Sequence, residues 1–225
     1  MPKILPAILT DSMTTLIEQL SAVQDAPQLE AVHIDIIDGM YVDNVTVTPL
    51  DLTTVEFGDT KIDLHLMTDE PMDAVYEAEA VREYLPIRQV IGQIERMSHQ
   101  GDFIWEVKKN NWEPVLGLNI FTPIEEIDDR IWNELDGVLL MSVEAGHQHG
   151  MFNRHVFEKI TELRAKPRSG PPLKITLDGG IKLNNFAEIL TANVQEVTAG
   201  SSLWDSTDPA ETFAEFNRLS SPAQG

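Results

Sequence analysis

Two short stretches decide how this sequence folds: His33-Ile34-Asp35-Ile36-Ile37-Asp38-Gly39 and Asp63-Leu64-His65-Leu66-Met67. Each reads as a buried β-strand that nevertheless contains ionisable side chains. Residues i and i+2 of a strand point to the same face, so His33 and Asp35 are expected to point together. Burying such groups costs several kcal/mol unless they are paired, hydrogen-bonded or bound to a metal. The two stretches therefore predict a functional cluster.

The rest of the chain alternates apolar runs with amphipathic stretches. We predict strands over Ile4–Leu9, Ala31–Asp35, Ile62–Met67, Ile87–Ile91, Val115–Asn119, Val138–Val143, Leu173–Leu177 and Glu196–Ala199. Helices are expected over Thr14–Val23, Pro71–Tyr84, Phe103–Lys109, Ile124–Leu135, Asn153–Arg164, Asn184–Thr191 and Pro209–Leu219, with one turn near Pro49–Thr54. This alternation indicates an α/β protein with a (β/α)₈ barrel, the TIM-barrel fold. The alternative is an open doubly wound sheet, but no strand is followed by the GxGxxG turn typical of one.

Two of these helices have start signals in the sequence. Thr122-Pro123 and Asp208-Pro209 each place a capping side chain before a proline in the first helical turn. Acidic residues follow both prolines, where the helix dipole favours them. We therefore expect a helix to begin at each of these positions.

The composition favours one globular unit. The chain has 225 residues, of which 42% are hydrophobic, enough for one continuous core. We expect a single domain over residues 1–219 and a frayed C-terminal tail over residues 220–225. The 16 Lys and Arg against 37 Asp and Glu give a net charge of −21. This charge argues against nucleic acid or an anionic membrane as a partner, because either needs a basic surface.

Several classes of protein and site are excluded or disfavoured. The chain has no cysteine, which excludes disulfides, cysteine-type zinc sites and thiol nucleophiles. No apolar run approaches the roughly 18 residues that a membrane span needs. The first residues, Met1-Pro2-Lys3-Ile4-Leu5, lack the layout of a signal peptide. We expect a cytoplasmic protein.

In a barrel of this kind, the chemistry lies at the C-terminal ends of the strands. Four ionisable residues meet that condition: His33, Asp35, His65 and Asp178. Two imidazoles and two carboxylates suit a divalent metal such as zinc, iron(II), manganese or cobalt. Taken alone, each residue could be a satisfied polar group of the core, but four at one end of the barrel favour a shared site.

The neighbouring acidic residues leave alternatives open. Asp63 lies two residues before His65, so it either orients that imidazole or pairs with a neighbour at the entrance of the strand. Asp38 is interpreted as a loop or capping residue, with support of the metal ligands from behind as the alternative.

Glycines follow the last two predicted strands. The motifs are Asp178-Gly179-Gly180-Ile181 and Ala199-Gly200-Ser201-Ser202. Glycines there let backbone N–H groups approach a phosphate, and barrels often bind phosphate at these two loops. The net charge of −21 repels an anionic ligand at long range, so local donors would have to carry the binding.

From Ile4 to about Trp204, the sequence resembles the ribulose-phosphate 3-epimerase family. The resemblance is carried by Val32–Gly39, Asp63–Met67, Leu118-Asn119-Ile120-Phe121-Thr122-Pro123, Met141-Ser142-Val143, Leu177–Gly180 and Ala199-Gly200-Ser201. It implies a (β/α)₈ barrel with one divalent metal, zinc, iron(II), manganese or cobalt, that interconverts D-ribulose 5-phosphate and D-xylulose 5-phosphate or a closely related ketose phosphate. It also implies a homo-oligomer.

The resemblance further implies roles for individual residues. His33, Asp35, His65 and Asp178 would ligate the metal, and Asp35 and Asp178 would also act as the acid/base pair. The residues implied for binding the phosphate are Gly146, Gly179, Gly180, Gly200 and Ser201. Met67 and Met141 would line the reacting centre.

This chemistry is consistent in itself. Inverting a carbon beside a carbonyl requires removing its proton on one face and supplying a proton on the other. Two carboxylates on opposite sides of a planar cis-enediolate can do so. A metal would hold the substrate oxygens and stabilise the negative charge that develops.

Three departures from the family pattern concern the substrate pocket. Ala7 stands where the family has a serine expected to touch the substrate, and Ile37 stands where it has a methionine. Where the family shows Asn-Pro-Gly-Phe-Gly-Gly-Gln, this chain has Glu144-Ala145-Gly146-His147-Gln148-His149-Gly150. His147 and His149 are interpreted as solvated loop residues, with a metal-binding pair or a contact to an anionic ligand as alternatives.

Two other functions remain to be weighed. The decarboxylase branch of the phosphate-binding barrels resembles this chain in fold and carries Asp-x-Lys-x-x-Asp on an early strand. The corresponding stretch here, Asp35-Ile36-Ile37-Asp38, has no lysine, which argues against a decarboxylase. A non-catalytic or repurposed metal-binding barrel of the same family, recognising a different ligand, is the second alternative.

Overall fold

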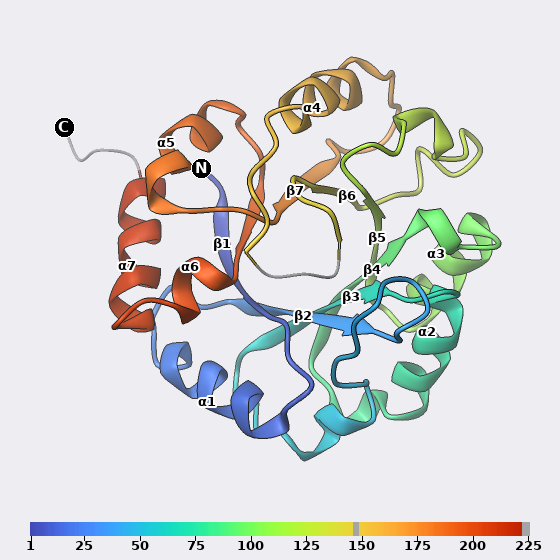
Figure 1. The fold of residues 1–225 in the computed structure, drawn as a ribbon. Helices are drawn as coiled ribbons and strands as arrows, with labels where there is room; N and C mark the ends of the chain where they lie inside the picture. The colour runs from blue at the N-terminus through green and yellow to red at the C-terminus, as the bar shows by residue number, and fades with distance from the viewer. Residues whose placement is uncertain (146–148, 222–225) are drawn as a thin grey trace.

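The strands form a closed barrel in a computed structural model that describes residues 1–145 and 149–221 (Figure 1). Eight parallel strands pair in sequence order, and β1 closes the barrel against β8. They are β1 (Lys3–Ile8), β2 (Ala31–Ile37), β3 (Lys61–Met67), β4 (Ile87–Gln93), β5 (Glu113–Leu118), β6 (Gly137–Met141), β7 (Lys174–Asp178) and β8 (Glu196–Ala199). The predicted (β/α)₈ barrel is confirmed, and the alternative of an open sheet is wrong, because β1 pairs with β8 and the sheet that the described residues form has no free edge.

Helices surround the barrel. The α-helices are α1 (Met13–Val23), α2 (Pro71–Ala80), α3 (Gln100–Lys109), α4 (Val156–Ala165), α5 (Leu183–Thr191), α6 (Ser201–Trp204) and α7 (Pro209–Ser220). Short 3₁₀ helices are η1 (Asp51–Thr54), η2 (Arg82–Tyr84), η3 (Ile94–Arg96) and η4 (Ile124–Glu126). The main hydrophobic core lies between this ring and the barrel wall. Among the described residues, no helix is both long and apolar enough to cross a membrane.

The helix expected over Ile124–Leu135 is wrong. Only η4 forms there, and turns follow it. The hydroxyl of Thr122, expected to cap the helix, instead donates to Glu95 Oε1 at 2.5 Å. The carboxylate of Asp128 accepts from the backbone N–H of Arg130 at 2.9 Å, which stabilises a local turn in competition with a helix. The Thr122 hydroxyl therefore makes a tertiary hydrogen bond in place of a helix cap, and the Asp128 carboxylate stabilises a turn in place of a continued helix.

Other predicted boundaries need smaller corrections. The stretch expected as one helix over Pro71–Tyr84 divides into α2 and η2, and the helix expected from Asn153 begins at Val156. The second start signal is confirmed, because the Asp208 carboxylate accepts from the Glu211 N–H at 3.0 Å at the beginning of α7.

The expected tail boundary falls one residue short of the end of α7. Ser220, which we placed in the tail, is the last residue of that helix and is buried. Its hydroxyl donates to the carbonyl oxygen of Pro2 at 2.8 Å. Residues 222–225 lie outside the described residues.

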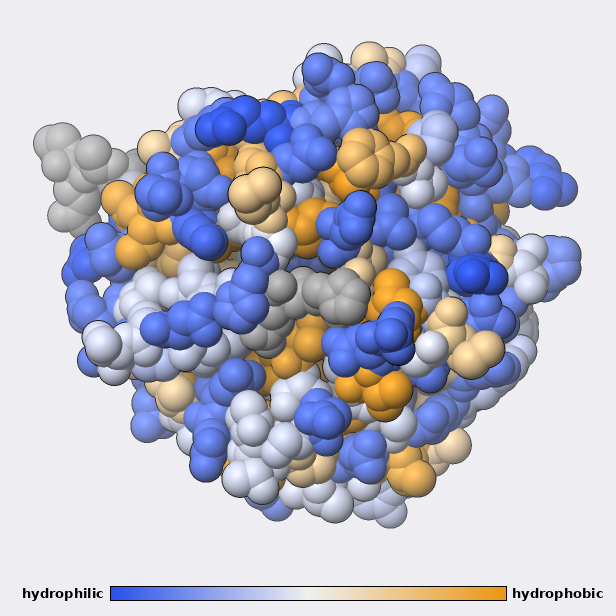
Figure 2. Space-filling view, viewed as in Figure 1, coloured by the Kyte–Doolittle hydropathy of each residue, from blue (hydrophilic) through white to orange (hydrophobic). Residues whose placement is uncertain are grey.

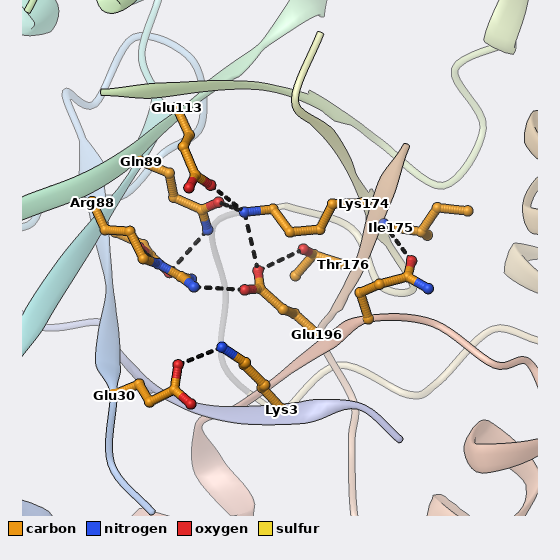
Figure 3. Close-up of polar contacts among 11 residues, drawn as sticks. Lys3, Glu30, Arg88, Gln89, Glu113, Lys174, Ile175, Thr176 and Glu196 are labelled. Atoms are coloured by element: carbon orange, nitrogen blue, oxygen red, sulfur yellow. Dashed lines mark hydrogen bonds and ion pairs between the residues drawn. The ribbon is translucent and has the colours of Figure 1, made fainter. Parts of the chain in front are cut away.

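A charged network fills the N-terminal end of the barrel (Figure 3). The guanidinium of Arg88 donates to the Asp63 carboxylate at 2.8 and 2.5 Å and to Glu196 at 2.7 Å. Lys174 donates to Gln89 at 2.5 Å and to Glu113 at 2.7 Å. Of the two alternatives for Asp63, the structure shows pairing with neighbours at the strand entrance, so its carboxylate does not orient His65.

Candidate metal centre and active site

Four ionisable side chains meet toward the C-terminal end of the barrel. His33 and Asp35 come from β2, His65 comes from β3, and Asp178 is the last residue of β7. All four are buried, and one potential ligand atom from each lies within 4.8 Å of the others. The structure thus brings together the four residues that we expected to share a site.

The ligand atoms face one another closely. His65 Nδ1 lies 2.9 Å from Asp35 Oδ1, 3.1 Å from His33 Nε2 and 3.6 Å from Asp178 Oδ2. His33 Nε2 lies 3.4 Å from the same Asp35 oxygen. Two imidazole nitrogens therefore converge on one carboxylate oxygen. Two nitrogen and two oxygen donors in this arrangement fit a divalent cation.

The electrostatics of the cluster favour a positive charge. Burial by itself lowers the pKa of His33, but the hydrogen bond to Asp35 and the negative charges of Asp35, Asp178 and Asp63 raise it to about 9. Burial raises the pKa of Asp35, but hydrogen bonds and charge interactions with both histidines hold that pKa below its ordinary value. The carboxylates thus stabilise a cation at this point, whether it is a protonated imidazole or a metal.

Residues that the sequence did not single out support the ligands. The hydroxyl of Thr198 on β8 donates to Asp178 Oδ1, and Gln93 on β4 contacts the far nitrogen of His65, with 3.1 Å between the two Nε2 atoms. The hydroxyl of Thr46 donates to the Asp35 carbonyl at 2.6 Å. The sequence contains a signal for two of them. Thr198 follows Glu196 by two residues and Gln93 follows Gln89 by four, so each polar side chain points to the same face of its strand as the earlier one.

A pocket opens above the cluster. Asp35 and Asp178 form part of its lining, together with both methionines expected at the reacting centre, Met67 and Met141. The remaining wall includes Ala7, Val143, His149, Gly179, Gly180, Gly200 and Ser201. On the face shown in Figure 2, hydrophobic residues gather near the centre, while hydrophilic residues dominate the periphery.

The glycines after β7 have conformations that other residues rarely adopt. Gly179 and Gly180 have φ values of +97° and +65°. A Cβ atom at Gly179 would lie 2.3 Å from Val143 Cγ2, and one at Gly180 would lie 2.7 Å from the backbone nitrogen of Phe152. The loop therefore requires glycine at both positions.

The altered loop after β6 is described only in part. Gly146, expected at the phosphate, and His147 lie outside the described residues. His149 lines the pocket, and its Nδ1 lies 3.4 Å from Asp205 Oδ2. Its imidazole is 63% exposed, which agrees with a solvated loop residue. Asp38 is a capping residue, because its carboxylate accepts from the N–H groups of Met40, Tyr41 and Asp69.

Solved structures of other enzymes share this fold. The 3-hexulose-6-phosphate synthase from Salmonella typhimurium aligns with a TM-score of 0.64 at 12% identity, over 96% of this chain and 97% of that chain. A tryptophan synthase α-subunit from Pyrococcus furiosus aligns with a TM-score of 0.65 at 13% identity, over 96% and 97%. At this identity the likeness shows the fold alone.

Sequence comparisons are more specific. Ribulose-phosphate 3-epimerase from Escherichia coli K12 is 31% identical over 95% of this chain and 93% of its own length. Ribulose-phosphate 3-epimerase 2 from Cupriavidus necator is 30% identical, over 92% and 86%. The Bacillus subtilis ribulose-phosphate 3-epimerase is 28% identical, over 96% and 98%. The model of the ribulose-phosphate 3 epimerase family matches residues 3–204. This protein therefore belongs to the ribulose-phosphate 3-epimerase family.

Proposed function

We propose that this protein is a metal-dependent epimerase that interconverts D-ribulose 5-phosphate and D-xylulose 5-phosphate, or a closely related ketose phosphate. The observation that carries the proposal is the buried cluster of two carboxylates and two imidazoles beneath a pocket, in a chain of this family. Epimerisation beside a carbonyl needs two proton carriers, and the cluster offers Asp35 and Asp178 from the non-adjacent strands β2 and β7.

Asp35 and Asp178 would exchange protons with the substrate on its two faces. One carboxylate takes the proton from the carbon beside the carbonyl, which leaves a planar cis-enediolate. The other carboxylic acid then gives a proton to the opposite face of that carbon, and the configuration inverts. In the reverse reaction the two residues exchange roles. The hydroxyl of Thr198 holds Asp178 in one orientation throughout.

His33, Asp35, His65 and Asp178 would hold the metal, which we propose is zinc, iron(II), manganese or cobalt. When bound, it supplies Lewis-acid stabilisation of the negative charge that develops on the substrate oxygens. Met67 and Met141 would form an apolar wall that excludes water from the reacting carbon.

We propose that the phosphate binds at the loops after β7 and β8. Gly179, Gly180, Gly200 and Ser201 line one side of the pocket and can present backbone N–H groups to an anion. Gly146 is proposed for the same role. A small sugar phosphate, not nucleic acid or a membrane, is the partner that we propose for a chain of net charge −21. A single domain that ends with α7, a cytoplasmic location and a homo-oligomer complete the proposal.

The direct test is turnover. The protein is incubated with D-ribulose 5-phosphate and Mn²⁺, Fe²⁺, Co²⁺ or Zn²⁺, and the formation of D-xylulose 5-phosphate is measured. Asp35→Asn and Asp178→Asn should each lower turnover by about 10²–10⁴-fold, because each removes one proton carrier. In D₂O, a variant with one carboxylate should exchange the proton of one epimer without forming the other. Absence of turnover with all four metals would overturn the proposal.

A second function is favoured by one observation. Ala7 lines the pocket, in place of the serine expected to touch the substrate. A non-catalytic or repurposed barrel would retain metal binding but recognise another ligand. Ala7→Ser distinguishes the two functions: in an epimerase it should leave turnover intact or raise it, whereas in a repurposed barrel neither the original protein nor the variant should convert the substrate.

A further inference from the structure

Gln93 is a buried amide in direct contact with the candidate metal centre. It is the last residue of β4, and β4 pairs with the strand β3 that carries His65. Its side chain is completely buried, and its Nε2 lies 3.1 Å from Nε2 of His65. The other amide atom, Oε1, has no hydrogen-bond partner among the described residues. Because buried polar atoms are normally hydrogen-bonded, an amide whose nitrogen contacts an imidazole and whose oxygen has no partner in the described part of the chain requires an explanation.

The roles of donor and acceptor in this contact depend on the tautomer of His65. When Gln93 Nε2 donates to His65 Nε2, the neutral imidazole has its proton on Nδ1, which faces Asp35 Oδ1 at 2.9 Å. Metal ligation through Nδ1 requires the opposite tautomer, with the proton on Nε2. That N–H then needs an acceptor. A half-turn of the Gln93 amide brings Oε1 into this position, because the two ends of an amide have nearly the same shape.

The strand beside Gln93 leaves space for its amide. Gln93 pairs in register with Gly117 on β5. A Cβ atom at position 117 would lie 2.9 Å from Gln93 Cδ and 3.0 Å from its Oε1. A side chain there would push the amide away from its position against His65. The glycine therefore permits the amide to lie between the two strands in either orientation.

We propose that Gln93 is a positioning residue for His65: its amide accepts the Nε2 proton when His65 Nδ1 ligates a metal, and donates to Nε2 when it does not. This inference rests on the proposed function only in that His65 is a metal ligand. The amide is suited to the task because it has a donor and an acceptor that exchange places by rotation about one bond.

Metal affinity tests the proposal with a matched control in the same strand. Gln93→Met removes the hydrogen bond and retains the length of the side chain. Gln89→Met makes the same change four residues earlier on the same strand, where the amide is also completely buried but contacts Asp63 and Lys174. The dissociation constant for Co²⁺ and the absorption spectrum of the bound ion are measured for each folded protein.

We expect Gln93→Met to weaken Co²⁺ binding by about 10–100-fold and to change the spectrum, as loss of a hydrogen-bond partner does for other metal-ligating histidines. Gln89→Met should leave both readouts unchanged. Gln93→Glu should retain the affinity of the original protein or exceed it, since a carboxylate accepts the Nε2 proton. In the metal-free protein, ¹⁵N shifts of His65 should show the proton on Nδ1, and Gln93→Met should give a mixture of tautomers.

The outcomes separate this inference from the proposed function. If the original protein binds Co²⁺ and Gln93→Met binds it equally well, the role of Gln93 is overturned and the epimerase proposal stands. The same conclusion follows if Gln89→Met weakens binding as much as Gln93→Met. If Gln93→Met does not fold, Gln93→Glu decides, and a loss of affinity in that variant contradicts the inference. If the original protein binds none of Co²⁺, Mn²⁺, Fe²⁺ and Zn²⁺, both proposals fail.

Discussion

At the scale of single residues, the site depends on side chains whose charges are set by burial and by close partners. Lys159 of α4, which lies outside the cluster, is also a buried ionisable residue whose pKa is changed by its surroundings. Its side chain is only 3% exposed, and its Nζ donates to the Asn119 carbonyl at 2.6 Å. Burial lowers the pKa of Lys159 from 10.5 to about 8, although the negative charges of Glu95 and Glu162 act in the opposite direction.

This shift predicts a pH-dependent stability. Between about pH 8 and pH 10.5 the folded protein has released the Lys159 proton and the unfolded chain still binds it. The unfolded state then binds more protons, so the contribution of Lys159 to stability rises with pH across this window. Lys159→Met should remove that rise, because methionine does not titrate. Lys159→Arg should also remove it, because arginine stays protonated across the window, but the cost of burying a charge then remains at every pH.

Urea unfolding at about pH 7 and about pH 10 checks the prediction. The loss of the hydrogen bond to Asn119 affects both pH values equally, so the comparison uses the change with pH and not the absolute stability. Equal pH dependence in the original protein and in Lys159→Met would show that the lysine titrates normally.

At the scale of elements, the loop between β7 and α5 is defined by backbone conformation. Gly180→Ala places a Cβ atom 2.7 Å from the backbone nitrogen of Phe152, at a φ of +65°. The variant should lose about 2 kcal/mol of unfolding free energy, from the left-handed conformation and the backbone contact. Displacement of the loop N–H groups should also raise KM for the proposed sugar-phosphate substrate by about tenfold or more.

Gly101→Ala is the control for that substitution. Gly101 lies in the first turn of α3, and its nearest neighbouring atom would be 3.7 Å from an added Cβ. Alanine should there leave KM unchanged and keep or raise the unfolding free energy by up to about 1 kcal/mol. Equal effects of the two substitutions on KM would contradict a specific role for the β7–α5 loop.

The elements also show which local signals can be trusted. All eight strands were predicted, because strands buried on both faces read as nearly continuous apolar runs. The proline signal at Asp208 predicted α7 correctly, yet the similar signal at Thr122 is followed only by the short 3₁₀ helix η4. The two signals differ in the hydrogen-bond partner of the capping side chain. The Asp208 carboxylate accepts from the N–H of Glu211 in its own helix, whereas the Thr122 hydroxyl donates to Glu95 of η3.

At the scale of the whole molecule, the barrel separates two groups of buried charge. The network around Arg88 fills the N-terminal end, and the candidate metal centre lies toward the C-terminal end. Among the described residues, Arg88→Met leaves Asp63 buried without a cation and leaves Glu196 with Lys174 alone, 3.8 Å away, and should destabilise the fold by about 3–5 kcal/mol. Because the two groups are at different ends, Co²⁺ affinity of the folded variant should be unchanged.

The unfolding free energy from urea titration and the Co²⁺ dissociation constant test this separation. Lys3→Met is the matched control, since Lys3 pairs with Glu30 at the same end of the barrel but both side chains are more than half exposed (Figure 3). We expect it to cost about 0–1 kcal/mol. A large loss of metal affinity in Arg88→Met would mean that the two ends are coupled.

The sequence by itself determined the order of strands, the joint orientation of His33 and Asp35, and the position of Asp178 at a strand end. These follow from period-2 alternation and from the rule that parallel strands are joined by helices, which are local properties of the chain. Only the tertiary structure decided which polar residues meet. Asp63 and His65 share one face of β3, and Gln89 and Gln93 share one face of β4. Within each pair, the first residue contacts the charged network at the N-terminal end of the barrel, and the second lies at the candidate metal centre. Their partners come from other strands, and the register between strands is a property of the closed barrel that no single stretch of sequence contains.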